Sequence, residues 1–298
     1  MKAAFLPDRG VVKVSGEDAR GFLNGLVTTD TSLLQPGLGR FGALLTPQGK
    51  IIADFLITEA AAGHGGGFLI DCPKVLAQSL ATKLGFYKLR AKVTVENLSD
   101  DLGVLAVWDG APQAKLDLTF ADPRDERLGW RILIPQDLAQ KAAALVGATM
   151  VEASDYEAHR IARDTPRGGL DFSYGDAFPH ETNMDRLHGV DFDKGCYVGQ
   201  EVVSRMQHRG TARTRTVRVA LDAAPPEAGV AIMAGGKQVG TMGSSAQGEG
   251  LAVVRIDKVA DALNAGTPLI AGGITIRLAA PDDVRNLQQK NAERKTVA

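Results

Sequence analysis

The amino-acid sequence predicts an α+β protein that ends in a small C-terminal β-barrel. Over the first part of the chain, strand-like and helix-like apolar patterns mix without a strict βαβ repeat, which favours α+β over a doubly wound sheet. After about residue 211, short strand-like runs separated by glycine and proline are typical of a small barrel. A length of 298 residues, 44% of them hydrophobic and 23% charged, suits a soluble chain of about two domains.

The elements of the first part follow from their periodicity, in chain order. Ser15 is the expected N-cap of the first helix, and Pro47 and Gly49 fit the turn of a hairpin. Strands are predicted over residues 11–14, 41–45, 51–57, 67–70, 91–95, 104–108 and 130–134. Helices are predicted over residues 16–27, from Asp71 and Pro73 through Leu84, and over residues 138–145 and 156–163.

The barrel is predicted from five strand-like runs that glycines and prolines separate. They cover residues 214–221, 230–233, 238–242, 252–256 and 269–278. The change from mixed helix and strand patterns to short strand-like runs predicts a domain boundary near residues 205–213. The predicted division is residues 1–211 for a first region of two lobes, 212–282 for the barrel and 283–298 for a polar tail that frays.

Composition limits the classes of function. A formal net charge of −1 provides no global field for nucleic acid, so direct nucleic-acid binding is not expected. The chain has two cysteines, Cys72 and Cys196, which is too few for a disulfide scaffold or a four-thiolate cluster. No apolar run approaches about 18 residues, and the N-terminus lacks a signal-peptide pattern. No membrane association and a cytoplasmic location are therefore predicted, and the absence of H-E-x-x-H and C-x-x-C spacings predicts no metal site.

The octapeptide Lys194–Glu201, Lys-Gly-Cys-Tyr-Val-Gly-Gln-Glu, is the most specific motif of the chain. Cys196 lies close to Lys194 and just ahead of a predicted helix, and both neighbours favour a thiolate. A thiolate can attack, be oxidised or hold a metal; the alternative is a small buried side chain in a tight turn. Gln200 and Glu201 fall in the first helical turn, where Glu201 has the alternative role of a cap.

Three further features are candidate binding groups. Asp54 interrupts an apolar strand, so it lies either on a solvated face or in a site with a partner. Glu181 and Asn183 follow Pro179 in a predicted loop, and a carboxylate there could pair with the amino group and ring N–H of a pterin. His180, between Pro179 and Glu181, is expected to be structural.

The run from Val202 to Val219 is basic and has no acidic residue. It contains His208 and the arginines Arg205, Arg209, Arg213, Arg215 and Arg218. Such a run could hold a folate glutamate tail, RNA phosphate or an acidic partner. The alternative is a solvated rim that pairs with carboxylates elsewhere in the chain.

The octapeptide resembles the signature of the YgfZ-type folate-binding proteins, relatives of the glycine-cleavage T-protein that assist iron–sulfur cluster assembly. Weaker resemblances to this superfamily extend over most of the chain, at residues 22–30, 42–57, 88–93 and 160–171. The resemblance implies a T-protein-like, folate-binding body with ferredoxin-like lobes, followed by the barrel. T-proteins carry an acidic pair after the hairpin glycines, whereas here Ala53 precedes Asp54, so aminomethyl transfer is not expected.

The resemblance implies an accessory protein that binds tetrahydrofolate, or a one-carbon derivative of it, and assists the assembly or repair of iron–sulfur clusters. Its expected partners are reduced folate and iron–sulfur client enzymes or assembly factors. A one-carbon transferase such as an aminomethyltransferase, and a tRNA-modification partner, remain alternatives. Cys196 and Lys194 are the candidate reactive residues. The candidate folate-binding residues are Asp54, Glu181, Asn183, Tyr197, Gln200, Glu201 and Arg205.

Overall fold

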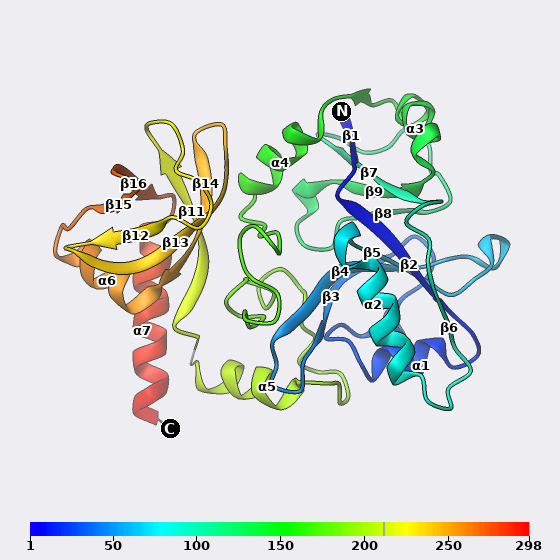
Figure 1. Ribbon diagram of the computed structural model, residues 1–298, viewed down its shortest axis with the longest axis horizontal. Coiled ribbons are helices and arrows are strands. Elements are labelled where there is room, and N and C mark those ends of the chain that lie inside the picture. Colours follow the sequence, from blue (N-terminus) through cyan, green and yellow to red (C-terminus); the bar gives the residue numbers. More distant parts are fainter. Residues whose placement is uncertain (211, 298) are drawn as a thin grey trace. The chain divides into compact units, whose positions relative to one another are not determined.

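A computed structural model of the protein describes residues 1–210 and 212–297, and the side chains up to residue 289. The chain forms two compact units (Figure 1). The first contains Met1–Pro47, Ile52–Tyr156 and Arg186–Val198; the second contains Gln48–Ile51, Glu157–Asp185 and the chain from Gly199 onward. Two five-stranded sheets with helices, and a closed C-terminal barrel, confirm the predicted α+β class with its barrel.

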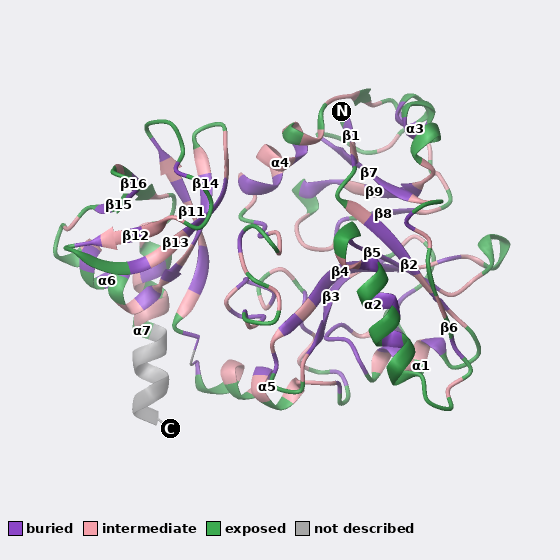
Figure 2. Ribbon diagram, viewed as in Figure 1, coloured by how far each residue is buried: buried purple, intermediate pink, exposed green. Residues whose placement is uncertain are grey.

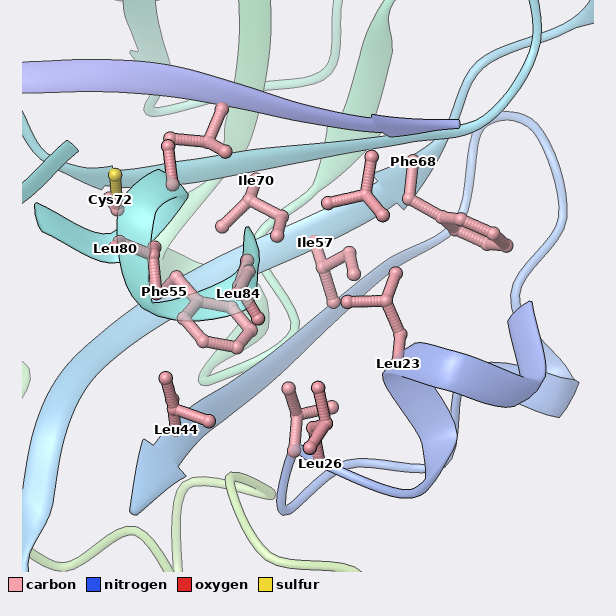
Figure 3. Packing of buried hydrophobic residues seen from close by; sticks show 14 of the residues in the cluster. Leu23, Leu26, Leu44, Phe55, Ile57, Phe68, Ile70, Cys72, Leu80 and Leu84 are labelled. Carbon is pink, nitrogen blue, oxygen red and sulfur yellow. The ribbon is translucent and has the colours of Figure 1, made fainter. Parts of the chain in front are cut away.

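One sheet of the first unit has the strand order β3–β4–β5–β2–β6. Its strands are β2 (Arg9–Ser15), β3 (Gly39–Leu45), β4 (Ile51–Glu59), β5 (Phe68–Pro73) and β6 (Thr94–Asn97). Helices α1 (Ala19–Asn24) and α2 (Lys74–Tyr87) contribute Leu23, Leu80 and Leu84 to one core with Phe55 and Ile70 of the sheet (Figure 3). Burying each large apolar side chain contributes about 1.5–3 kcal/mol.

The other sheet of the first unit has the order β10–β1–β7–β9–β8. Its strands are β1 (Lys2–Leu6), β7 (Gly103–Trp108), β8 (Thr119–Ala121), β9 (Trp130–Ile134) and β10 (Thr149–Met150). Helix α3 (Ala139–Leu145) packs Ala139, Ala142 and Ala143 against Leu105 and Ile132 of the sheet. Small side chains let the helix approach the sheet closely.

The barrel belongs to the second unit and closes in the order β11–β14–β13–β12–β15–β16. Its strands are β11 (Thr214–Leu221), β12 (Ala231–Ala234), β13 (Lys237–Ala246), β14 (Glu249–Arg255), β15 (Leu269–Ala271) and β16 (Ile274–Leu278). Helix α6 (Ile256–Asn264) follows β14 and adds Val259 to the barrel core. The other α-helices of the described residues are α4 (Ala153–Ile161), α5 (Gln200–Arg209) and α7 (Pro281–Val297). Among these residues no helix is both long and apolar enough to cross a bilayer.

Asp171, in the loop after helix α4, bonds this part of the second unit to strand β13 of the barrel. Asp171 accepts hydrogen bonds from the backbone N–H and the hydroxyl of Ser244, at 2.7 and 2.6 Å, and forms an ion pair of 2.8 Å with Arg160. Asp171 and Arg160 are both buried. A buried ion pair of this kind requires that its other polar atoms also be satisfied, and the Arg160 guanidinium also donates to the Thr165 carbonyl and the Ser244 hydroxyl.

Several predicted element bounds are wrong. The first helix begins at Ala19 rather than residue 16, because Ser15 ends strand β2 and Asp18, not Ser15, occupies the N-cap position. The run 269–278 is two strands, because Gly272 and Gly273 turn the chain with φ of 56° and 81°. The strand predicted at 91–95 begins only at Thr94.

The predicted polar tail is part of helix α7, which begins at Pro281. The domain boundary placed at residue 211 lies outside the described residues, as do the side chains beyond residue 289. Helix α6 and strand β1 were not predicted from the sequence patterns.

Candidate functional site

Lys194 is buried and holds the turn that follows helix α1. Its Nζ donates to the carbonyls of Asn24, Val27 and Thr29, at 2.7, 2.7 and 2.9 Å. The last carbonyls of a helix lack intrahelical partners, so a cation is favourable there. An ammonium has three donors, and these carbonyls use all three. Lys194 thus anchors the start of the octapeptide to the end of α1.

Burial also changes the protonation of this lysine. It lowers the pKa of Lys194 to about 8, against the opposing effect of the Asp30 and Asp191 carboxylates. Tyr197 lies beside the ammonium, with its ring centroid 5.2 Å from the Lys194 Nζ, in the range of a cation–π contact. Burial raises the pKa of Tyr197 to about 12, so the phenol stays neutral at physiological pH.

The octapeptide therefore presents its residues in two directions. Lys194 and Tyr197 are buried, whereas Gly195 and Cys196 between them are exposed. Helix α5 begins at Gln200, four residues after Cys196. The structure places an accessible thiol on a loop that two buried neighbours hold in place; the predicted effect of Lys194 on its reactivity stays a prediction.

The other cysteine has a different environment. Cys72 is fully buried in the core beneath α2 (Figure 3). Burial raises the pKa of Cys72 to about 12, so it behaves as a small apolar side chain. Among the described residues, no group of three or more His, Cys, Asp or Glu side chains is arranged to hold a metal ion.

Of the candidates on helix α5, Glu201 and Arg205 form an exposed ion pair of 2.6 Å with each other. Other arginines of the basic run are also paired: Arg215 with Asp185, and Arg218 with Asp164 and Glu249. This pattern corresponds to the alternative interpretation, a rim that pairs with carboxylates. Gln200 is half-buried at the start of the helix.

The second unit contains a cavity beside Glu181. Its volume is about 420 Å³, and its lining includes Glu181, Thr182, Thr214, Thr241, Phe172 and Met242. The Glu181 Oε2 accepts a hydrogen bond of 2.9 Å from the Phe178 N–H. Burial raises the pKa of Glu181 above its ordinary value, although this hydrogen bond and Lys50 oppose the shift.

Asn183 does not line this cavity. Its side-chain amide donates to the Thr216 carbonyl at 2.8 Å, and its backbone lies in the left-handed region with φ of 60°. Asparagine tolerates that region better than most residues, so Asn183 is suited to a structural role in the turn. His180 is buried, as expected for a structural residue, and contacts Gln207 at 3.1 Å.

Asp54 is buried on β4 of the first unit, so the solvated-face interpretation is wrong. It lies among buried arginines and carboxylates. Asp71 pairs with Arg9 at 2.6 Å, and Asp122 pairs with Arg124 at 2.6 Å. Burial opposes ionisation of Arg9, yet the charges of Asp71 and Asp54 raise the pKa of this guanidinium above its ordinary value.

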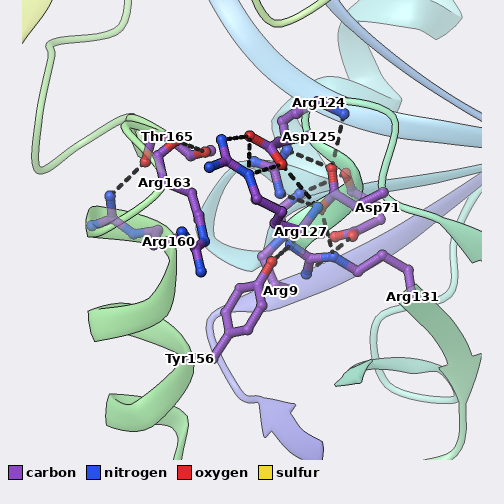
Figure 4. A network of polar contacts seen from close by, with 11 residues as sticks. Arg9, Asp71, Arg124, Asp125, Arg127, Arg131, Tyr156, Arg160, Arg163 and Thr165 are labelled. Carbon is purple, nitrogen blue, oxygen red and sulfur yellow. Dashed lines mark hydrogen bonds and ion pairs between the residues drawn. The ribbon is translucent and has the colours of Figure 1, made fainter. Parts of the chain in front are cut away.

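The rest of this buried network was not predicted from the sequence (Figure 4). Arg131 donates to the Tyr156 hydroxyl at 2.6 Å and approaches Asp122 at 3.3 Å. Burial would raise the pKa of Asp122, but Arg124 and Arg131 lower it to about 2. Asp71 and Arg131 each interrupt an apolar strand, as Asp54 does, and that signal could have identified them.

Comparison with known proteins gives two domain matches. Residues 8–157 match the GCVT N-terminal domain family, and residues 213–286 match the family described as the CAF17 C-terminal beta-barrel domain. The crystal structure of glycine cleavage system aminomethyltransferase T from Bartonella henselae superposes with a TM-score of 0.70 and 17% identity. The likeness covers 93% of this chain and 84% of that one, and at this identity it shows the fold alone.

Curated relatives of this chain carry the name iron–sulfur cluster assembly factor. The mitochondrial factor IBA57 of Mus musculus is 32% identical over 88% of this chain and 80% of its own length. The Homo sapiens protein of the same name is 31% identical, over 85% and 77%. A homologue from Mycosarcoma maydis is 37% identical over 77% of this chain, which spans 60% of that protein.

These names contradict the predicted cytoplasmic location, because the relatives are mitochondrial proteins. That prediction depended on the lack of a signal peptide and of a long apolar run, and neither feature separates the cytoplasm from an organelle.

Proposed function

Because this chain belongs to the family of the iron–sulfur cluster assembly factors named IBA57, with its GCVT and CAF17-type domains, we propose that it assists the assembly or repair of iron–sulfur clusters in client enzymes. We further propose, from the resemblance of its octapeptide Lys194–Glu201, that it is of the YgfZ type. Aminomethyl transfer is not part of the proposal, since Ala53 replaces one acidic residue and Asp54 lies in a buried network of arginines.

The observation that carries this proposal is the exposed thiol of Cys196 on its anchored loop. Thiolates are the ligands that iron–sulfur clusters use. The chain has one exposed cysteine, whereas a cluster takes several ligands. Cys196 therefore supplies one ligand to a cluster that a partner also holds, and the client's own thiolates replace it by ligand exchange.

Reduced folate is the cofactor that we propose for the second unit. The cavity beside Glu181 combines a carboxylate with the hydroxyls of Thr182, Thr214 and Thr241, which suits the donors and acceptors of a pterin. Glu181 would accept from the pterin amino group and ring N–H. When bound, tetrahydrofolate supplies an electron-rich ring and nitrogens that carry one-carbon groups.

Deletion of the gene in its host tests the function. We expect the activities of cluster-dependent enzymes to fall while their protein levels are retained. In a parallel assay, the purified protein should not form methylene-tetrahydrofolate from an aminomethyl-lipoyl carrier protein. Normal cluster enzymes in the deletion strain, together with aminomethyl transfer at a typical enzymatic rate of about 1–1000 per second, would replace this proposal with the aminomethyltransferase.

Substitution of Glu181 tests the folate part. Loss of one charge-assisted contact costs about 1.5–3 kcal/mol, so Glu181→Gln should weaken reduced-folate binding about 10- to 100-fold at pH 7.5. Because the pKa of Glu181 is raised, its carboxylate is ionised above that pKa and the contact is lost as pH falls through it. Wild-type affinity should therefore fall between pH 7.5 and 5, and the variant should lose this part of the dependence.

Calorimetry at both pH values is the measurement, with Asp176→Asn as the matched control. Asp176 also lines the cavity, but its side chain is 90% exposed, so its loss should change the affinity less than about threefold. Equal binding by wild type and Glu181→Gln at both pH values would remove Glu181 from the site. If the protein binds no reduced folate, the folate proposal is wrong and the proposed cluster function is unaffected.

A further inference from the structure

The C-terminal end of helix α2 and the turn after it expose three large apolar side chains. Phe86 is 77% exposed, Tyr87 38% and Leu89 89%. The inward side of the same helix is packed: Ala77, Leu80 and Leu84 lie in the core. Figure 2 shows the exposed side of α2 in green. The apolar side chains at this end therefore contribute little to the core of their own unit.

Basic side chains surround these apolar groups. Lys83, Lys88 and Arg90 are exposed, and the sequence has no acidic residue between Asp71 and Glu96. We name Lys83, Phe86, Tyr87, Lys88, Leu89 and Arg90 the α2 patch. Aromatic residues and arginine are enriched in protein–protein interfaces and among the residues that dominate their binding energy.

The backbone at Leu89 is strained. Its φ is 43°, in the left-handed region that costs an L-residue about 1–2 kcal/mol and that glycine adopts freely. The turn is closed by a hydrogen bond of 2.7 Å from the Ala91 N–H to the Lys88 carbonyl. Stability alone would favour glycine at this position, whereas the chain has a leucine that is almost fully exposed.

Lys92, two residues after the α2 patch, and Lys194, two residues before Cys196, hold opposite ends of one short helix. The Lys92 N–H donates to the Asp18 carboxylate at 2.8 Å, just before α1 begins. Lys194 holds the Asn24 carbonyl at the other end of α1. Helix α1 has six residues, so it is about 9 Å long. The two anchoring contacts are thus about 9 Å apart along α1, a separation smaller than the width of a standard interface of about 800 Å² per partner.

We propose that the α2 patch binds an acidic face of an iron–sulfur protein, whose cluster then lies near Cys196. This inference rests on the proposed function. The charge of the patch requires an acidic partner, and its apolar side chains require one with an apolar pocket. A protein provides both. RNA is disfavoured by the net charge of −1, and a membrane surface would call for a larger basic cluster than these three cations.

The test begins in cells, with a photo-crosslinking phenylalanine analogue at position 86 and, as a control, at position 75. Val75 is 85% exposed at the other end of α2. Position 86 should crosslink an acidic iron–sulfur protein that position 75 does not. Titration of that purified protein should show affinity about tenfold or more weaker for Phe86→Ser and Leu89→Gly than for wild type or Val75→Ser.

Charge is tested in the same titration. Arg90→Glu should weaken binding more than Lys141→Glu, an equal charge change at an exposed position on α3, and high salt should reduce the difference. Leu89→Gly should keep or raise the melting temperature, which separates lost binding from lost folding. Phosphatidylglycerol vesicles, total tRNA and the protein itself are the competing probes.

Patch-dependent binding to one of these three probes, no specific crosslink, or equal affinity of all variants would each overturn the inference. Experiments in the host organism distinguish a failure of this inference from a failure of the proposed function. If patch variants rescue a deletion strain fully, the docking proposal is wrong and the proposed cluster function is unaffected. If the cluster-dependent enzymes of the deletion strain have normal activity, the proposed function itself is wrong.

Discussion

In a deletion strain, the Cys196→Ala variant should leave the activities of cluster-dependent enzymes as low as they are without the protein. The exposed Cys196 thiol is the ligand that we propose for the cluster, so its loss removes the contact rather than weakening it. Because Cys196 is exposed, the stability of the variant should change by no more than about 0.5 kcal/mol. Enzyme assays at equal protein levels, with Cys196→Ser alongside, measure the effect.

Cys72→Ala is the matched control and should behave in the opposite way. Cys72 is fully buried, so truncation should destabilise the protein by about 1 kcal/mol while leaving cluster enzymes active. Alkylation gives an independent check: the folded protein should react rapidly at one thiol and the denatured protein at two. Full rescue by Cys196→Ala would mean that this cysteine has no chemical role.

Replacing Lys194 by methionine should destabilise the first unit by about 3 kcal/mol. The change leaves the carbonyls of Asn24, Val27 and Thr29 without their donor, and each buried, unpaired acceptor costs about 1–3 kcal/mol. Part of this cost is offset, because the variant no longer has to bury an ammonium group. Chemical denaturation measures the effect. Lys92→Met, which removes an exposed ion pair with Glu17, should cost less than about 1 kcal/mol.

The Lys194 effect should also depend on pH. The pKa of Lys194 is about 8 in the folded protein and 10.5 ordinarily, so between these values the unfolded chain binds more protons. The contribution of Lys194 to the free energy of unfolding therefore rises with pH between these two values, by at most about 1.4 kcal/mol per pH unit. The difference between wild type and Lys194→Met should widen from pH 8 to pH 10. A constant difference would show that the lysine stays charged.

Local patterns predicted the fold class well because the buried faces of these strands and helices repeat at regular intervals. The hairpin of β3 and β4, strands β7 and β9 and most barrel strands lie where alternation and turn residues place them. The barrel was predicted from glycines and prolines that separate short runs, and the 269–278 run failed because its two glycines make a turn inside it.

The candidate site was predicted less completely, because a side chain's role depends on which distant backbone reaches it. Sequence reasoning identified Cys196 and Lys194 as neighbours, yet Lys194 donates to carbonyls about 170 residues earlier and Cys196 faces solvent. Glu181 and Asn183 were grouped by proximity in the sequence, and only Glu181 lines the cavity. The arginines of the network around Asp54 come from strand β2, a loop and strand β9, namely Arg9, Arg124 and Arg131, and no local pattern connects these segments.

By itself, then, the sequence determined the α+β class, the C-terminal barrel and the motif that holds the accessible cysteine, since these depend on local periodicity and on one specific octapeptide. Only the tertiary structure decided that Lys194 is an anchor, that Asp54 is buried among cations and that the end of α2 is left uncovered. Burial and hydrogen-bond partners arise from contacts between segments far apart in the chain, and those contacts are set when the whole unit packs.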